Sequence, residues 1–145
     1  MEKTADNNFY FHECMRYREY FNVMLQWTLL LQKGIKIDEY LSSKGYKSIV
    51  IYGMSDIGNC LAGELLKSKQ CALLYTIDQG TPKLYYDVKC YRLNELNDLD
   101  RPDIIIITLP HIYEKIKNDV GQKIDCKILS ITELVYDAYY SLEVK

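Results

Sequence analysis

The chain has 145 residues, 48% of them hydrophobic, and a formal net charge of -2. This length and composition suit one domain with its own core, and they exclude a mainly disordered chain. The near balance of 18 basic and 20 acidic residues argues against nucleic acid as a partner.

Five cysteines are spread along the chain, and none forms a C-x-x-C pair. We therefore expect a reducing, cytoplasmic environment without a disulfide framework. His12 and Cys14 resemble half a metal site, but no second pair accompanies them, so we expect no metal. We also expect neither a signal peptide nor a membrane span, because the first residues are acidic and polar and the apolar run that follows is short.

Residues 9 to about 33 predict a long helix, because apolar side chains recur three and four residues apart. These positions are Cys14, Tyr17, Phe21, Met24 and Leu31, with Thr28 in the remaining slot. Further apolar residues widen the stripe, so more than one face of the helix must be covered. With a shorter helix at about 38–44, it forms an expected helical arm over residues 1–45. We expect this arm either to pack on its own domain or to make a homodimer or another protein contact through residues 9–33.

Strands and helices alternate over residues 46–145, the second expected part of the chain. Expected strands lie at about 47–53, 71–78, 88–91, 103–108 and 127–131, and expected helices at about 56–66, 93–99, 111–120 and 132–140, the last capped by Thr132. The unbroken run of Ile in the fourth strand predicts burial on both faces. The alternation predicts a minimal Rossmann-like α/β domain, an open parallel sheet of about five strands in the order 3-2-1-4-5.

A Gly-rich segment, residues 53–58, follows the first strand with the spacing of the dinucleotide fingerprint G-x-G-x-x-G. Gly53 and Gly58 fit the tight turn and the close packing of helix on strand. Ser55 stands in place of the middle glycine, and its hydroxyl could donate to a phosphate or its bulk could exclude one. Asp56 puts a negative charge at the helix N-terminus, where a phosphate would otherwise bind.

Two further elements complete the candidate site. Asp78 ends the second strand about twenty residues after Gly58, where an acidic group binds a ribose hydroxyl or simply starts a turn. Thr108, Pro110 and His111 follow the fourth strand, beside the crevice where the strand order reverses. His111 there contacts a ligand or only begins a helix. The candidate cofactor-binding residues are Gly53, Met54, Ser55, Asp56, Ile57, Gly58, Asp78, Thr108, Pro110 and His111.

No catalytic residue is assigned. The Gly-rich turn lacks the Lys of a P-loop and the spacing of a nucleophile elbow. A Tyr-x-x-x-Lys pair typical of short-chain dehydrogenases occurs at Tyr113 and Lys117, but a chain this rich in Tyr and Lys contains such pairs by chance.

The run from Gly45 to Gly58, GYKSIVIYGMSDIG, with the Asp-ended second strand, resembles Rossmann-like domains of bacterial surface-polysaccharide biosynthesis proteins. It is similar to the N-terminal domain of PglD-type sugar acyltransferases over residues 47–134. The resemblance implies a nucleotide-sugar pocket lined by Gly53, Ser55, Asp56, Gly58 and Asp78. This chain departs from the pattern at Ser55. The β-helix that transfers the acetyl group in those enzymes is not part of this sequence, so no transferase activity is implied.

The sequence thus predicts a small module that binds NAD, a nucleotide or a nucleotide sugar without catalytic machinery of its own. Two alternatives stay open. One is a ligand-free interaction module that docks through its Tyr-rich N-terminal helix, and the other is a subunit of an NAD-dependent oxidoreductase.

Overall fold

The computed structural model describes residues 2–141, so residues 1 and 142–145, at the ends of the two expected parts, lie outside the description. Five helices are present in this range, together with two short 3-10 helices: α1 (Glu2–Gln32), α2 (Ile37–Ser43), α3 (Asp56–Leu66), η1 (Leu93–Glu95), η2 (Pro110–Ile112), α4 (Tyr113–Gly121) and α5 (Ile131–Tyr140). The strands are β1 (Ser48–Tyr52), β2 (Ala72–Ile77), β3 (Cys90–Tyr91), β4 (Ile104–Ile107) and β5 (Lys127–Ser130).

The five strands form one parallel sheet in the order β3-β2-β1-β4-β5, which confirms the predicted Rossmann-like topology. Tyr52, the last residue of β1, pairs with Ile77 of β2 and with Ile107 of β4. The strand order reverses between β1 and β4. The segments that follow these two strands therefore flank one crevice at the carboxyl edge of the sheet.

The sheet lies between two helical layers. All four isoleucines of β4 are fully buried, as the unbroken run predicted. Ile104 and Ile106 pack in the cluster formed with α1, α2, α3 and α5, whereas Ile105 and Ile107 face the side covered by α4. Alternate residues of a central strand therefore contribute to two separate cores.

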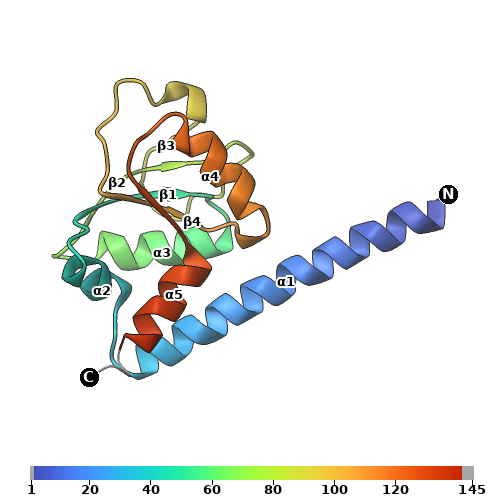
Figure 1. Cartoon of the computed structure of the whole chain (residues 1–145), viewed down its shortest axis with the longest axis horizontal. Coiled ribbons are helices and arrows are strands. Elements are labelled where there is room, and N and C mark those ends of the chain that lie inside the picture. Colours follow the sequence, from blue (N-terminus) through green and yellow to red (C-terminus); the bar gives the residue numbers. More distant parts are fainter. Residues whose placement is uncertain (1, 142–145) are drawn as a thin grey trace.

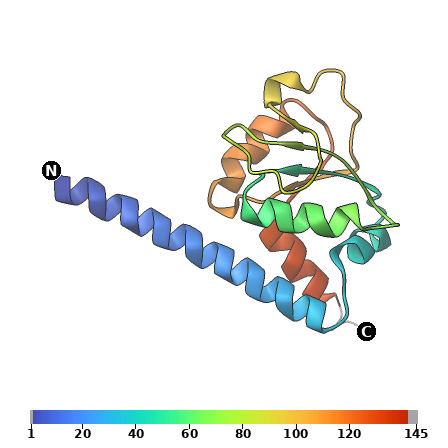
Figure 2. The same ribbon diagram turned by 180° about the vertical axis from the view of Figure 1, so that it is seen from behind.

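Helix α1 has one buried face and one long exposed face. Its C-terminal half packs on the domain through Val23, Trp27 and Leu30, while its N-terminal half projects beyond the sheet and its helices (Figure 1, Figure 2). Within the described range, no helix, α1 included, combines the length and the apolarity needed to cross a membrane.

A partly buried carboxylate connects three helices. Glu64 of α3 accepts a 3.0 Å hydrogen bond from the indole Nε1 of Trp27 in α1, and a 3.1 Å bond from the backbone amide of Ile37 in α2. Both oxygens therefore accept a hydrogen bond, which offsets the cost of removing part of the carboxylate from water.

Two local predictions were wrong. Residues 93–99 form only the single turn η1, because Leu96 reaches the core from an irregular segment without a regular helix. The last helix is capped by Ser130, whose Oγ accepts a 3.1 Å bond from the amide of Glu133, and not by Thr132. The final residue of β5 thus supplies the cap, so the helix begins one residue earlier than expected.

Candidate functional site

The Gly-rich turn requires glycine at both of its ends. Gly53 has φ +105°, and a Cβ there would lie 2.7 Å from Oγ1 of Thr108. A Cβ on Gly58 would lie 2.0 Å from the carbonyl oxygen of Gly53. The turn geometry expected from the fingerprint is present, and it needs these two glycines whether or not a ligand binds.

The N-terminus of α3 has no side-chain cap. Ser55 occupies the N-cap position in an extended conformation, and its side chain accepts no bond from the first turn. Its Oγ is buried and has no hydrogen-bond partner among the described residues. The amides of the first helical turn have no partner within the helix, so this end offers donors to an anion. The negative charge of Asp56 counteracts the positive end of the helix dipole. One of its carboxylate oxygens accepts a 3.2 Å hydrogen bond from the Tyr85 hydroxyl.

Asp78 lies at the end of β2, as predicted, and its carboxylate holds two turns. Oδ2 accepts a 2.8 Å bond from the amide of Met54, and Oδ1 accepts a 2.7 Å bond from the amide of Gly80. A carboxylate has about four acceptor positions, so each oxygen can still accept a bond from a ligand hydroxyl. The contact with a ribose stays a prediction.

The loop after β2 folds back along α3. The amide of Lys83 donates to the carbonyl of Met54 at 3.0 Å, and Asn59 bonds the backbone of Lys83 and Tyr85 at 2.7 and 3.1 Å. The side chains of Met54 and Ile57 are buried in the core. These two predicted site residues can therefore offer a ligand their backbone only.

Helix α1 covers the crevice beside the Gly-rich turn. Tyr20 is partly buried with its hydroxyl close to Ser55, and burial raises the pKa of its phenol. The rings of Tyr20 and His111 meet edge to face, with centroids 6.2 Å apart. Desolvation beside α1 lowers the pKa of His111, although the residue as a whole is exposed. Arg16 donates from Nη2 to Glu13 at 2.8 Å, while its buried Nε has no partner in the described part of the chain.

The residues that follow β4 differ in what they do: some hold the turn in place and others are exposed. Thr108 is fully buried, and its hydroxyl contacts the carbonyl oxygens of Tyr52 and Gly53, so it ties the end of β4 to the turn. His111 is exposed, and Pro110 lines a cavity. The ten predicted residues therefore converge on one edge of the sheet, but the side chains of Met54, Ile57 and Thr108 are buried.

The cavity beside Pro110 has a volume of about 340 Å³ and lies between α1, η2 and the start of α5. Its polar lining consists of two carboxylates, an amide and several hydroxyls, including Glu19, Glu133, Asn22, Thr132, Tyr113 and Tyr136. Oε2 of Glu19 is buried and has no partner within residues 2–141. Such a lining suits a ligand rich in hydroxyl groups.

Arg16, Glu19 and Tyr20 were missed by the sequence analysis, which treated their helix as an arm. The available signal was the charged and tyrosine-rich run Arg16-Tyr17-Arg18-Glu19-Tyr20 in the middle of the helix. Positions 16, 19 and 20 share a face that differs from the apolar stripe.

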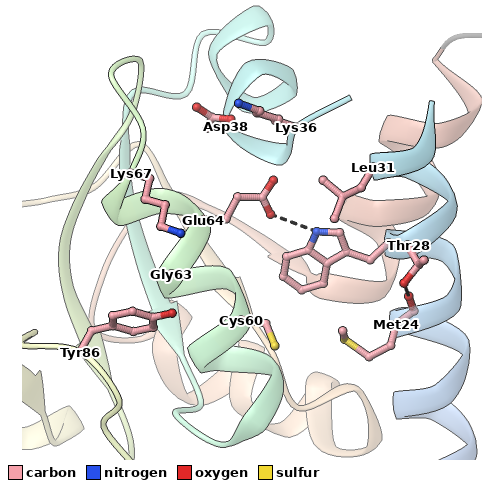
Figure 3. A pocket seen from close by; sticks show the side chains of 11 residues that line it. Met24, Thr28, Leu31, Lys36, Asp38, Cys60, Gly63, Glu64, Lys67 and Tyr86 are labelled. Carbon is pink, nitrogen blue, oxygen red and sulfur yellow. Dashed lines mark hydrogen bonds between the residues drawn. The ribbon is translucent and has the colours of Figure 1, made fainter. Parts of the chain in front are cut away.

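A further cavity, of about 470 Å³, lies between α1 and α3 (Figure 3). Neither this cavity nor the one beside Pro110 has residues of the Gly53–Gly58 turn in its wall. Over the described residues, no group of three or more His, Cys, Asp or Glu side chains is placed to hold a metal ion.

No family model matches the chain, and no curated protein matches it significantly. Among solved structures, the chain is similar to a chorismate mutase/shikimate 5-dehydrogenase fusion protein from Clostridium acetobutylicum, with 17% identity and a TM-score of 0.44. The match covers 85% of this chain and 53% of that chain, so this chain spans about half the length of that protein. The class of the fold is defined by the sheet itself, whose order and parallel strands are Rossmann-like.

Proposed function

We propose that this protein is a nucleotide-binding module whose ligand lies at the carboxyl edge of the sheet, between the Gly-rich turn and α1. One observation carries the proposal: the buried Ser55 Oγ makes no hydrogen bond of normal geometry within the described residues at the uncapped N-terminus of α3, although the Tyr20 hydroxyl lies close to it. Arg16 of α1, one turn before Tyr20, has a buried Nε that is also without a partner in the described structure, while its Nη2 donates to Glu13 and its guanidinium lies 5.4 Å from the centroid of the Tyr17 ring. Helix amides, a hydroxyl and a guanidinium together suit a phosphate group.

A nucleotide sugar fits this edge better than NAD. With its phosphates between Ser55 and Arg16, its ribose extends toward Asp78 and its sugar toward the 340 Å³ cavity. The carboxylates of Glu19 and Glu133 can accept bonds from sugar hydroxyls. This choice agrees with the resemblance to surface-polysaccharide biosynthesis proteins. We assign the module binding rather than catalysis, with NAD as the alternative ligand.

A thermal-shift panel with NAD, NADP, ATP, UDP and UDP-sugars tests the proposal. A ligand at about 100 times its Kd adds about 2.7 kcal/mol of stability, and we expect UDP-sugars to stabilise more than UDP. Arg16→Gln removes the phosphate contact and should reduce the shift, whereas Arg18→Gln, on an exposed part of the same helix, should not. The absence of any shift with a cooperatively unfolding protein would overturn the proposal.

A second candidate function is an interaction module that binds no nucleotide. It is favoured by the two backbone bonds that already engage Asp78, and by the exposed aromatic side chains of α1. This candidate predicts no stabilisation by nucleotides and a protein contact through α1.

A further inference from the structure

The exposed face of α1 carries a continuous seam with a strict repeat. The side chains at its positions are all exposed and none is charged: Tyr10, Cys14, Tyr17, Phe21, Met24, Thr28 and Leu31. They lie on another face than Val23, Trp27 and Leu30, which attach the helix to its own domain. The apolar stripe that predicted the helix is therefore not the face that packs on the sheet.

The spacing of this seam alternates between four and three residues, an average repeat of 3.5. Such a repeat keeps one line of side chains facing a second helix along its whole length, as in a coiled coil. In both views the N-terminal half of α1 projects beyond the domain (Figure 1, Figure 2). The seam thus suits another helix of similar length better than the surface of the domain itself.

We infer that the seam pairs with α1 of a second copy of this chain, in parallel orientation. In the heptad, Cys14, Phe21 and Thr28 take the a positions, which places Glu13 at g and Arg18 at the next e. A parallel pair brings these opposite charges together across the interface twice, once on each side of the twofold axis. An antiparallel pair sets g against g and e against e, so Glu13 and Arg18 never meet.

The 470 Å³ cavity provides a second, independent argument. It adjoins the seam, because Met24, Thr28 and Leu31 line it together with Trp27 on the α1 side, opposite Cys60 and Gly63 of α3 (Figure 3). In a parallel pair, the e side of one helix faces the g side of the other. The flank of the second copy that carries Leu25, itself 47% exposed, then lies along the open edge of this cavity. One occupant therefore covers both the seam and the cavity.

This inference does not depend on the nucleotide proposal, and it names the partner for the contact through α1 that the second candidate function requires. Sedimentation equilibrium should give twice the 17.1 kDa mass of the chain. Phe21→Glu places two like charges in the seam and should raise the dissociation constant about tenfold or more. Met15→Glu, which changes an exposed apolar residue off the seam, should leave it unchanged.

Cys14 reports the orientation. In a parallel pair, the same a position of the two helices meets across the interface. Mild oxidation should therefore cross-link the dimer through the two Cys14 residues. Cys14→Ser should abolish the cross-link, and Cys60→Ser, which removes another exposed thiol, should retain it. A monomer at about 100 µM, or a dimer that neither cross-links through Cys14 nor responds to Phe21→Glu, overturns the inference. Circular dichroism of each variant checks folding, and nucleotide thermal shifts on the same samples test the proposed function separately.

Discussion

The amide of Met54 donates a 2.8 Å hydrogen bond to Oδ2 of Asp78, which joins the Gly-rich turn to the end of β2. The other oxygen, Oδ1, accepts a 2.7 Å bond from the amide of Gly80. The acidic residue expected at a ribose is therefore also part of the scaffold that shapes the site. Its two roles can be separated by measuring stability and binding independently.

Asp78→Ala should lower the free energy of unfolding by about 1–3 kcal/mol, because it leaves the amides of Met54 and Gly80 without their acceptor. Asp78→Asn keeps one carbonyl oxygen, so its free energy of unfolding should lie between those of the parent and of Asp78→Ala. Urea denaturation of the three proteins measures this. An Asp78→Ala variant as stable as the parent would show that these bonds do not support the turn.

Gly58→Ala should destabilise the protein by about 1–3 kcal/mol, since the new methyl group would displace the carbonyl of Gly53. Gly121→Ala is the matched control, because nothing lies within 4 Å of a Cβ at the end of α4. That variant should be neutral or up to about 1 kcal/mol more stable. Thermal unfolding compares them, and equal melting temperatures would contradict the geometry of the turn.

Most of the fold could be predicted because it depends on local patterns. The Ile run of β4 and the Gly-rich turn each determine a short segment, and right-handed crossovers then restrict the strand order. The contact of α1 with the site could not be predicted in this way. A repeat shows which side chains share a face, but whether Tyr20 or Phe21 meets the domain depends on packing between segments far apart in the sequence. The helix predicted over residues 93–99 was wrong for a similar reason, since burial of Leu96 did not require a helix.

Glu64 should make stability depend on pH. Burial raises the pKa of its carboxyl above the ordinary value, although the bonds from Trp27 and Ile37 oppose the shift. A raised folded-state pKa gives a contribution to stability that is fully present below the unfolded pKa and is lost as pH rises through the folded pKa. Glu64→Gln has no such titration. The advantage of the parent over this variant in unfolding free energy should therefore fall as the pH rises above the ordinary Glu pKa of about 4.3 and through the raised folded-state pKa. A constant difference in urea titrations would refute the assignment.

Tyr20 should control the titration of His111. Desolvation beside α1 lowers the pKa of that imidazole, and the Tyr20 ring lies against it. Tyr20→Ala should raise the pKa toward its ordinary value, whereas Tyr17→Ala, on the exposed seam, should not change it. The chain has two histidines, so NMR titration can follow each ring separately. Identical pKa values in both variants would mean that Tyr20 does not shield His111.

The most direct test of the proposed site is an amide NMR titration of the protein with UDP-sugars and, in parallel, with NAD. We predict chemical-shift changes at Ser55–Gly58, at the N-terminus of α3, and in α1 around Arg16 and Tyr20. Changes confined to other surfaces, such as the cavity between α1 and α3, would contradict the account. No change at saturating concentrations of either ligand would leave the protein as an interaction module built on a Rossmann-like scaffold.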